Sequence, residues 1–175
     1  MTSLDTPHLT LLPSAPEHLL ALIDEPEHFG RLVGVPPAEG LRQFFVSDEV
    51  SPDWLDALRS SSKPDPWRHG FFVLHRESRS VIGSAGFKGP PDSAGVVEIA
   101  YGIVPRFEGH GYATEAAAAL VRFAFASGRV RLVRAHTLPV ANPSTRVLVK
   151  CGFHRTGDVV DPDDGPVWRW ELSAP

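Results

Sequence analysis

The sequence predicts a single α/β domain built on a mixed, mostly antiparallel sheet of about seven strands flanked by helices. Its 175 residues fit one domain, 1–175, and no internal repeat or long linker divides them. Short apolar runs bounded by turn residues predict strands, some of them joined as hairpins. A glycine-rich segment joins one such run to an alanine-rich helical pattern.

The first third of the chain carries few regular signals. Residues 9–12 predict a short strand, and residues 16–23 predict a helix. Residues 26–66 are rich in Pro, Gly and Ser. We therefore expect a largely irregular segment there, with one helix at 53–59 that a Ser-Pro pair opens.

The rest of the chain predicts regular elements in close succession. The expected strands are 71–75, 81–87, 96–104, 130–137, 153–160 and 167–172, and the expected helices are 114–127 and 143–151. Small apolar residues recur at helical spacing before Gly128, which ends the first of these helices. An Asp-Asp-Gly turn at 163–165 predicts a hairpin between the last two strands.

The composition excludes several classes of partner. A formal net charge of −4 gives no basic excess for binding nucleic acid. Cys151 is the single cysteine, so we expect neither an intramolecular disulfide nor a cysteine metal cluster. No apolar run approaches the roughly 18 residues of a membrane span, and the N-terminal segment lacks a signal-peptide pattern. We expect a cytoplasmic protein with no membrane partner.

The segment Arg106–Ala113 predicts an anion site. Gly109 and Gly111 lack a Cβ, so the backbone can turn sharply and bring successive N–H groups near a ligand. These donors meet at a helix start, where unpaired amides and the helix dipole favour an anion. No Walker sequence is present, and Thr114 replaces the third glycine of a dinucleotide fingerprint. A diphosphate is the expected ligand, and a capped turn that binds no ligand is the alternative.

Two ordered motifs carry a family resemblance. The first runs from Glu98-Ile-Ala-Tyr-Gly-Ile-Val104 into Arg106-x-x-Gly109-x-Gly111-Tyr-Ala-Thr-Glu-Ala116. The second reads Asn142-Pro-Ser144-Thr-Arg146-Val-Leu-Val-Lys150-Cys-Gly152-Phe153. With the neighbouring strands they cover about residues 70–172, and they resemble the GNAT superfamily of acetyl-CoA-dependent N-acetyltransferases. The Tyr-Ala-Thr-Glu-Ala string of the first motif and the Ser-x-Arg-Val-Leu-x-Lys-x-Gly-Phe string of the second are similar to the branch that includes the ribosomal-protein N-terminal acetyltransferases.

The resemblance implies how acetyl-CoA is held. Strands 96–104 and 130–137 are expected to lie parallel at the centre of the sheet and to splay apart around the pantetheine arm. The implied cofactor contacts are Ile103, Val104, Arg106, Glu108, Gly109, His110, Gly111, Tyr112, Ala113, Asn142 and Ser144. Pro105 supports the splay because the residue before a proline is held extended, although a strand that simply ends there needs no ligand.

Glu108 and His110 are ionisable residues of the loop, close to the expected anion site. Glu108 stands where the family often carries a basic or neutral residue. Its side chain must point away from the phosphates, because like-charge repulsion would weaken binding. His110 is expected to contribute its backbone N–H.

Acetyl transfer requires an amine with a free lone pair. Lysine amines have an ordinary pKa of about 10.4 and α-amines of about 7.7 to 8.0, so the first need a base more. The resemblance makes Glu98 the candidate base, and partial burial would raise its pKa. A solvent-facing Glu98 with a water chain as base is the alternative. His136 is either a second candidate base or a core histidine whose ring nitrogens are hydrogen-bonded within the protein.

Departure of the coenzyme A thiolate gains from a hydroxyl donor. Many relatives use a tyrosine at the position that is Leu148 here. In the branch that this sequence resembles a serine serves, and Ser144 matches it. Asn142 and Ser144 also make a good helix start, and both roles are compatible.

The motifs together predict direct attack of a primary amine on acetyl-CoA in a ternary complex. Glu98 and Ser144 are the predicted catalytic residues, and no metal is expected. A protein N-terminal α-amine is the first acceptor expected. A small-molecule amine such as an antibiotic, a polyamine or an amino acid is the alternative, as is a non-catalytic acetyl-CoA-binding module. The oligomeric state is left open, and the aromatic-rich last strand could serve as the contact surface of a homodimer.

Overall fold

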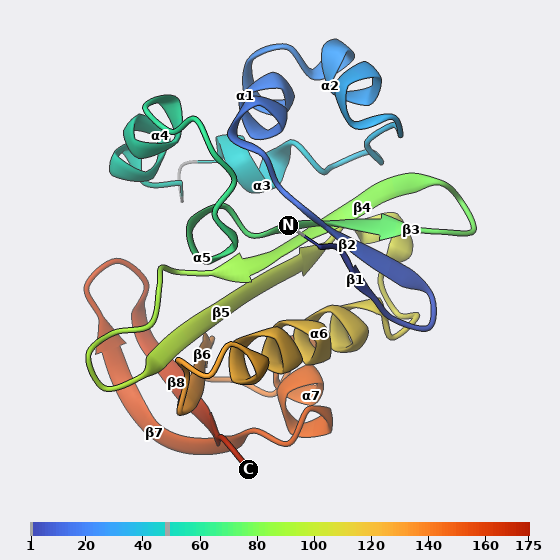
Figure 1. Ribbon diagram of the computed structural model, residues 1–175. Coiled ribbons are helices and arrows are strands. Elements are labelled where there is room, and N and C mark those ends of the chain that lie inside the picture. The colour runs from blue at the N-terminus through green and yellow to red at the C-terminus, as the bar shows by residue number, and fades with distance from the viewer. Residues whose placement is uncertain (1, 48–49) are drawn as a thin grey trace.

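The computed structural model describes residues 2–47 and 50–175 as an α/β fold around one eight-stranded sheet (Figure 1). The strand order is β1-β2-β3-β4-β5-β6-β8-β7. The strands are β1 (Leu4–Asp5), β2 (Leu9–Pro13), β3 (Phe71–His75), β4 (Ser80–Phe87), β5 (Val96–Ile103), β6 (Leu132–Thr137), β7 (His154–Asp161) and β8 (Gly165–Ser173). Neighbouring strands are antiparallel except for the parallel pair β5 and β6, which confirms the predicted mixed sheet.

The helices lie on both sides of this sheet. They are α1 (Pro16–Asp24), α2 (Pro26–Val33), α3 (Gln43–Val46), α4 (Pro52–Arg59), α5 (Pro66–His69), α6 (Tyr112–Ala126) and α7 (Pro143–Lys150), with a short 3-10 turn η1 (Pro105–Phe107). Figure 1 shows α1 to α4 on one side of the sheet and α6 with α7 on the other. Of the helices in the described ranges, none has the length and apolar character needed to cross a membrane.

The N-terminal third holds more helix than the sequence predicts. One helix is expected between residues 26 and 66, but α2, α3 and α4 lie there and α5 begins at its end. Pro26, Pro52 and Pro66 each occupy the first turn of a helix, where the missing N–H costs nothing. Pro52 starts the one helix that was predicted here, whereas Pro26 and Pro66 start helices that were not.

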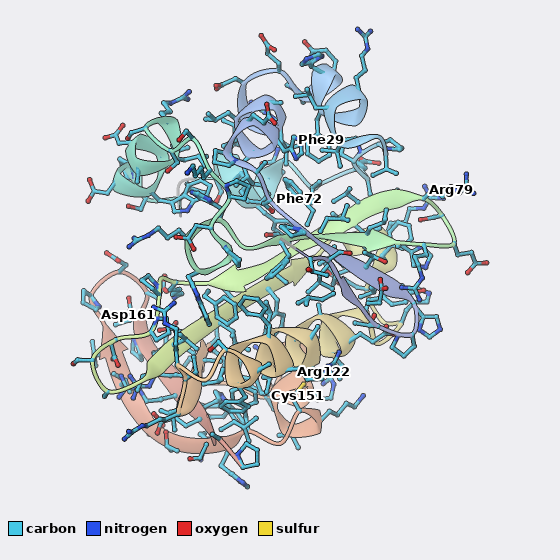
Figure 2. The ribbon with its side chains drawn as sticks, in the orientation of Figure 1. Phe29, Phe72, Arg79, Arg122, Cys151 and Asp161 are labelled. Carbon is cyan, nitrogen blue, oxygen red and sulfur yellow. The ribbon has the colours of Figure 1, made fainter. Side chains whose placement is uncertain are left out.

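A hydrophobic core lies on both faces of the sheet. On one face, Phe29 of α2 meets Phe72 of β3 edge-on, with ring centroids 5.2 Å apart (Figure 2). On the other, α6 buries Ala116, Ala117 and Leu120 against the strands, as its apolar periodicity predicts. These small side chains let the helix that follows the glycine loop lie close to the sheet.

The two parallel strands separate part-way along their length. Their register pairs are Val96 with Leu132, Val97 with Val133, and Glu98 with Arg134. Beyond Glu98, β5 continues beside β4 alone, and beyond Arg134, β6 continues beside β8. This confirms the predicted splay and leaves a gap at the centre of the sheet.

Candidate active site

The loop after β5 presents backbone amides at the start of α6. Gly109 and Gly111 have φ of 79° and 83°, a left-handed conformation that favours glycine. The first hydrogen bond of α6 runs from the Glu115 N–H to the Gly111 carbonyl, at 3.1 Å. The preceding amides of the first turn therefore have no acceptor within the helix, and they can serve an anion.

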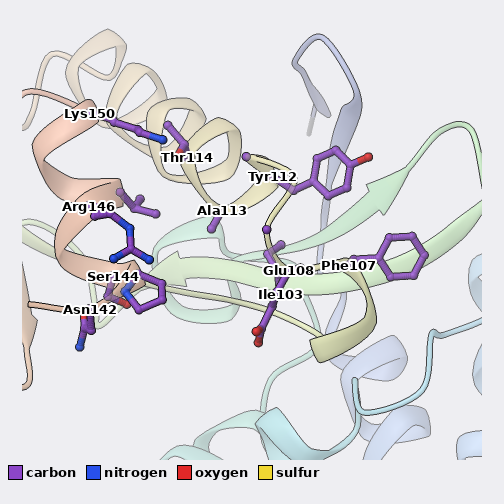
Figure 3. A pocket seen from close by; sticks show the side chains of 14 residues that line it. Ile103, Phe107, Glu108, Tyr112, Ala113, Thr114, Asn142, Ser144, Arg146 and Lys150 are labelled. Atoms are coloured by element: carbon purple, nitrogen blue, oxygen red, sulfur yellow. The ribbon is translucent and has the colours of Figure 1, made fainter.

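A cavity of about 680 Å³ lies between this loop and α7 (Figure 3). Its lining consists of Ile103, Phe107, Glu108, Gly109, Gly111, Tyr112, Ala113, Thr114, Asn142, Pro143, Ser144, Arg146, Val147 and Lys150. Arg146 and Lys150 are four residues apart on α7, so both face the cavity across from the loop. Two cations opposite a row of free amides suit a diphosphate.

The start of α7 is fixed by a capping box. The Asn142 side-chain oxygen accepts from the Thr145 N–H at 2.9 Å, and the Thr145 hydroxyl accepts from the Asn142 N–H at 3.0 Å. The Asn142 oxygen is thus used by the helix, although the residue lines the cavity. This box holds Ser144 in the first turn, where its side chain reaches the gap in the sheet.

Side chains of the loop brace it from behind. The Tyr112 hydroxyl is hydrogen-bonded to His75 Nε2 at 3.0 Å, and Figure 3 shows its ring directed away from α7. His110 Nδ1 lies 2.8 Å from the Glu108 carbonyl oxygen, and its ring stacks on Tyr112. These side chains hold the loop in shape, while its backbone faces the cavity.

The gap between β5 and β6 forms a second cavity of about 160 Å³. It is lined by Lys88, Glu98, Ile99, Ala100, Tyr101, Ala135, His136, Thr137 and Ser144. Ser144 lines both cavities and therefore stands where they meet.

The two faces of β5 offer different groups to this gap. Side chains alternate along a strand, so Glu98 and Ala100 share one face while Tyr101 and Ile103 share the other. Ile103 reaches the first cavity, on the side of α6 and α7. Gly102, on the opposite face, lies so close to α3 that an added Cβ would meet the Phe44 ring at 3.0 Å. The gap thus connects the two sides of the sheet.

Glu98 lies in a group of charged and polar side chains. Its Oε2 atom is 2.8 Å from Lys88 Nζ and 3.1 Å from His136 Nδ1. The Glu98 side chain is 21% exposed, so the expected partial burial is present. Burial alone would lower the pKa of Lys88, but the hydrogen bond and charge of Glu98 raise it above its ordinary value.

Tyr101 lies against Ser144 at the other mouth of the gap. Burial raises the pKa of Tyr101 strongly, and the neighbouring Ser144 hydroxyl offsets only part of this shift. The phenol therefore stays protonated at neutral pH and can act as a hydrogen-bond donor.

Comparison with known proteins assigns the family. The model of the acetyltransferase (GNAT) domain matches residues 8–154. The chain belongs to the GNAT acetyltransferase family. It is 30% identical over 87 residues to an uncharacterised N-acetyltransferase, p20, of Bacillus licheniformis, a match that covers 50% of this chain and 49% of p20. It is 28% identical over 133 residues to an uncharacterised N-acetyltransferase, YoaA, of Bacillus subtilis, which covers 69% of this chain and 75% of YoaA.

Solved GNAT structures share the fold across nearly the whole chain. The ribosomal-protein-S5-alanine acetyltransferase of Vibrio fischeri has a TM-score of 0.67 at 13% identity, with 99% of this chain and 97% of that chain covered. RimJ of Mycobacterium smegmatis, in complex with a coenzyme A disulfide, has a TM-score of 0.65 at 20% identity, with 99% and 86% covered. The activity class of this GNAT chain is acetyl-CoA-dependent N-acetylation, and these neighbours leave its acceptor open.

The structure brings most of the predicted cofactor residues of this GNAT domain to one cavity. Those in its lining are Ile103, Glu108, Gly109, Gly111, Tyr112, Ala113, Asn142 and Ser144. Figure 3 shows the Glu108 carboxylate near Ile103, away from the amides that start α6. The Glu108 side chain therefore points away from the anion site, so its negative charge does not face the expected phosphates.

Three predicted contacts lie outside this lining. The Val104 side chain is fully buried, and the Val104 N–H donates to the Ile82 carbonyl at 2.8 Å, so that N–H is not free to bind pantetheine. The prediction overlooked that alternate backbone groups of β5 face β4. Arg106 is exposed on η1, and His110 folds back onto the loop.

The sequence reasoning also missed several residues of the site. Arg146 and Lys150 could have been found from their spacing of four on a helix that follows the second motif. Tyr101 and Lys88 could not, because Tyr101 meets Ser144 only where α7 packs beside β5, and Lys88 meets Glu98 only through the pairing of β4 with β5. No cluster of three or more metal-ligating side chains occurs within residues 2–47 and 50–175.

A further cleft of about 270 Å³ lies between α4, α5 and the end of β4. Trp54, His69 and Phe87 line it, together with Lys88, which also lines the gap in the sheet. Burial lowers the pKa of His69, which keeps this imidazole neutral at neutral pH. The cleft combines apolar side chains with this neutral imidazole, and it shares Lys88 with the gap that contains Glu98.

Proposed function

We propose that this GNAT domain transfers the acetyl group of acetyl-CoA to a primary amine by direct attack within a ternary complex. The observation that carries this proposal is the position of Ser144, which lines both the phosphate-side cavity and the gap that contains Glu98. Cofactor and acceptor can then approach from opposite sides of the sheet and meet in the gap.

The cofactor side is built from backbone and cations. The loop amides before Glu115 and the side chains of Arg146 and Lys150 would hold the diphosphate. The β6-facing backbone groups of Ile103 and Tyr101 lie on the unpaired side of β5 and would pair with pantetheine amides. Acetyl-CoA supplies the activated acetyl group, and the chain supplies its orientation.

We assign Glu98 the role of base. Lys88 and His136 both contact its Oε2 atom, which leaves Oε1 to receive the proton of the amine. We assign Ser144 the role of hydrogen-bond donor to the departing sulfur, with the Tyr101 phenol behind it. Retention of both functional groups favours an active enzyme over a binding module.

We propose a protein N-terminal α-amine as the acceptor. An α-amine has an ordinary pKa of about 7.7 to 8.0, so a single carboxylate is sufficient to complete its deprotonation. The cleft of Trp54, His69 and Phe87 offers an apolar surface for the first side chain of a peptide. The fold neighbours named for ribosomal-protein acetylation support this choice by analogy.

A homodimer stays a prediction. β8 is paired on both sides, so the outer strand of this half is β7.

A thiol-release assay with acetyl-CoA tests the acceptor. The panel holds short peptides with free N-termini, the same peptides blocked at the N-terminus but carrying lysine, polyamines, aminoglycosides and free amino acids. We expect turnover with free N-termini and none with the blocked peptides. Turnover confined to polyamines, aminoglycosides or amino acids would replace the α-amine proposal with a small-molecule acceptor. Acetyl-CoA binding in calorimetry without turnover of any amine would indicate a binding module.

A further inference from the structure

A row of four side chains crosses the gap from β4 to β8. Lys88 Nζ and His136 Nδ1 contact Glu98 Oε2, and Arg169 Nε donates to His136 Nε2 at 3.1 Å. His136 and Arg169 face each other directly in the register of β6 and β8. The His136 side chain is only 15% exposed, so both of its ring nitrogens are committed within the protein.

The guanidinium of Arg169 determines where the proton of His136 lies. Arginine carries only donors and keeps its charge at any ordinary pH. His136 Nε2 must therefore accept, which places the single proton of the neutral ring on Nδ1. This Nδ1 proton faces Glu98, whose Oε2 atom lies 3.1 Å from Nδ1.

We propose that Arg169 is a positioning residue that holds His136 as a neutral Nδ1–H donor and, through it, orients Glu98 toward the acceptor amine. This inference rests on the proposed function for its kinetic consequence, but the tautomer of His136 does not. With Nε2 occupied, His136 cannot serve as the second base that its place beside the gap suggested.

The charges around His136 set the consequence of removing Arg169. Glu98 faces the ring from β5, Arg169 faces it from β8, Lys88 joins from the end of β4, and Asp161 of β7 is within electrostatic range. Two register positions along the same strands, Arg134 pairs with Glu171 at 2.7 Å.

Without Arg169 one cation is lost and Nε2 is free to bind a second proton. Histidines ordinarily take that proton near pH 6.5. The imidazolium would then bind the Glu98 carboxylate as an ion pair and weaken it as a base. The loss of activity would therefore be greatest in acid.

The test compares Arg169→Met, Arg169→Lys and the control Arg155→Met. Arg155 lies on β7 with its guanidinium over the Trp168 ring, outside the row. One readout is the tautomer of His136 from long-range ¹H–¹⁵N spectra, assigned with His136→Gln. The other is kcat across the pH range, with the KM for acetyl-CoA measured alongside.

We expect the Nδ1–H tautomer in the wild-type protein, in Arg169→Lys and in Arg155→Met. In Arg169→Met we expect Nε2 to become protonatable and the acid limb of kcat to move up by about one pH unit, a loss of about 10-fold near pH 6 and little loss near pH 8.5. The KM for acetyl-CoA should not change.

An Nε2–H tautomer in the wild-type protein would overturn the proposal, even if Arg169→Met does not fold. A pH-independent loss of kcat in a folded Arg169→Met variant would also overturn it, because that result indicates only a structural role. If no amine is acetylated, the proposed function fails, while the tautomer spectra still decide the role of Arg169.

Discussion

Glu98 and Tyr101 lie three positions apart on β5 and direct their side chains to opposite faces of the sheet. Glu98 meets Lys88 and His136 on the face toward α3, and Tyr101 meets Ser144 on the face toward α7. Because β6 has already separated from β5, both side chains border the same gap. The base and the hydroxyl donor that we propose therefore lie on the two sides of one opening.

Tyr101→Phe should lower kcat by about 10-fold, because it removes the hydroxyl that supports Ser144 in the gap. Acetyl-CoA affinity should stay near the wild-type value. Tyr112→Phe is the matched control, since it removes the other tyrosine hydroxyl of the chain, which bonds to His75 behind the loop. Steady-state kinetics and calorimetry check both variants, and equal kcat values for the two would remove Tyr101 from the reaction.

Gly111→Ala should weaken acetyl-CoA binding and destabilise the fold. A side chain at φ of 83° costs about 1–2 kcal/mol, although an added Cβ would meet nothing within 4 Å. Gly128→Ala provides the control, because Gly128 has φ of 73° and equally open space at the other end of α6. Both variants should lose similar unfolding free energy, but only Gly111→Ala should lose affinity in calorimetry. Similar affinities would show that the loop does not bind the cofactor.

Arg146→Met should raise the Kd for acetyl-CoA by about 10-fold, because a charge-assisted contact with a phosphate is worth about 1.5–3 kcal/mol at most. The loss should shrink as salt is added. Arg122→Met, on the exposed side of α6, is the control and should bind as the wild type does. An unchanged Kd for Arg146→Met would place the phosphates elsewhere.

Glu115→Gln should lower stability at neutral pH by about 1–2 kcal/mol. Burial would raise the pKa of Glu115, but hydrogen bonds from the Thr6 hydroxyl at 2.6 Å and from the His8 N–H at 3.0 Å hold this pKa below its ordinary value. A lowered folded-state pKa means that this stabilisation is present above the unfolded-state value and is lost as pH falls through the folded-state value.

Urea unfolding of Glu115→Gln at neutral pH and near pH 3 measures this contribution. The difference from wild type should shrink in acid. Glu77→Gln, at an exposed turn position, should match the wild type at both pH values. A difference that persists unchanged in acid would mean that the charge of Glu115 does not stabilise the fold.

The strand, loop and helix from Val96 to Ala126 could be predicted because their signals are local. Alternation, paired glycines and alanine spacing each act within a few residues. Helices α2 and α5 were missed, since a proline indicates either a break or a helix start and only the packing of Phe29 and Trp67 into the core decides. Helix α3 is four residues long, too short to give a periodic signal.

In the candidate site too, features with a local sequence signal could be predicted and features that depend on tertiary packing could not. Backbone amides of the loop and the capping residue Asn142 follow from motifs. The neighbours of Glu98 and Ser144 do not, because Lys88 and His136 reach Glu98 through strand order and register, and Tyr101 reaches Ser144 through the position of α7 beside β5. Sequence patterns specify which face a side chain takes, but they do not specify which strand lies beside it.

The most direct test of acetyl transfer in the gap is the kcat of Ser144→Ala with the best acceptor, measured beside its affinity for acetyl-CoA. Ser144 lines both cavities, and its loss removes only one hydroxyl while Asn142 and Thr145 keep the helix cap. We expect kcat to fall by about 10- to 100-fold with little change in Kd. A wild-type kcat in a variant that binds acetyl-CoA normally would contradict the account.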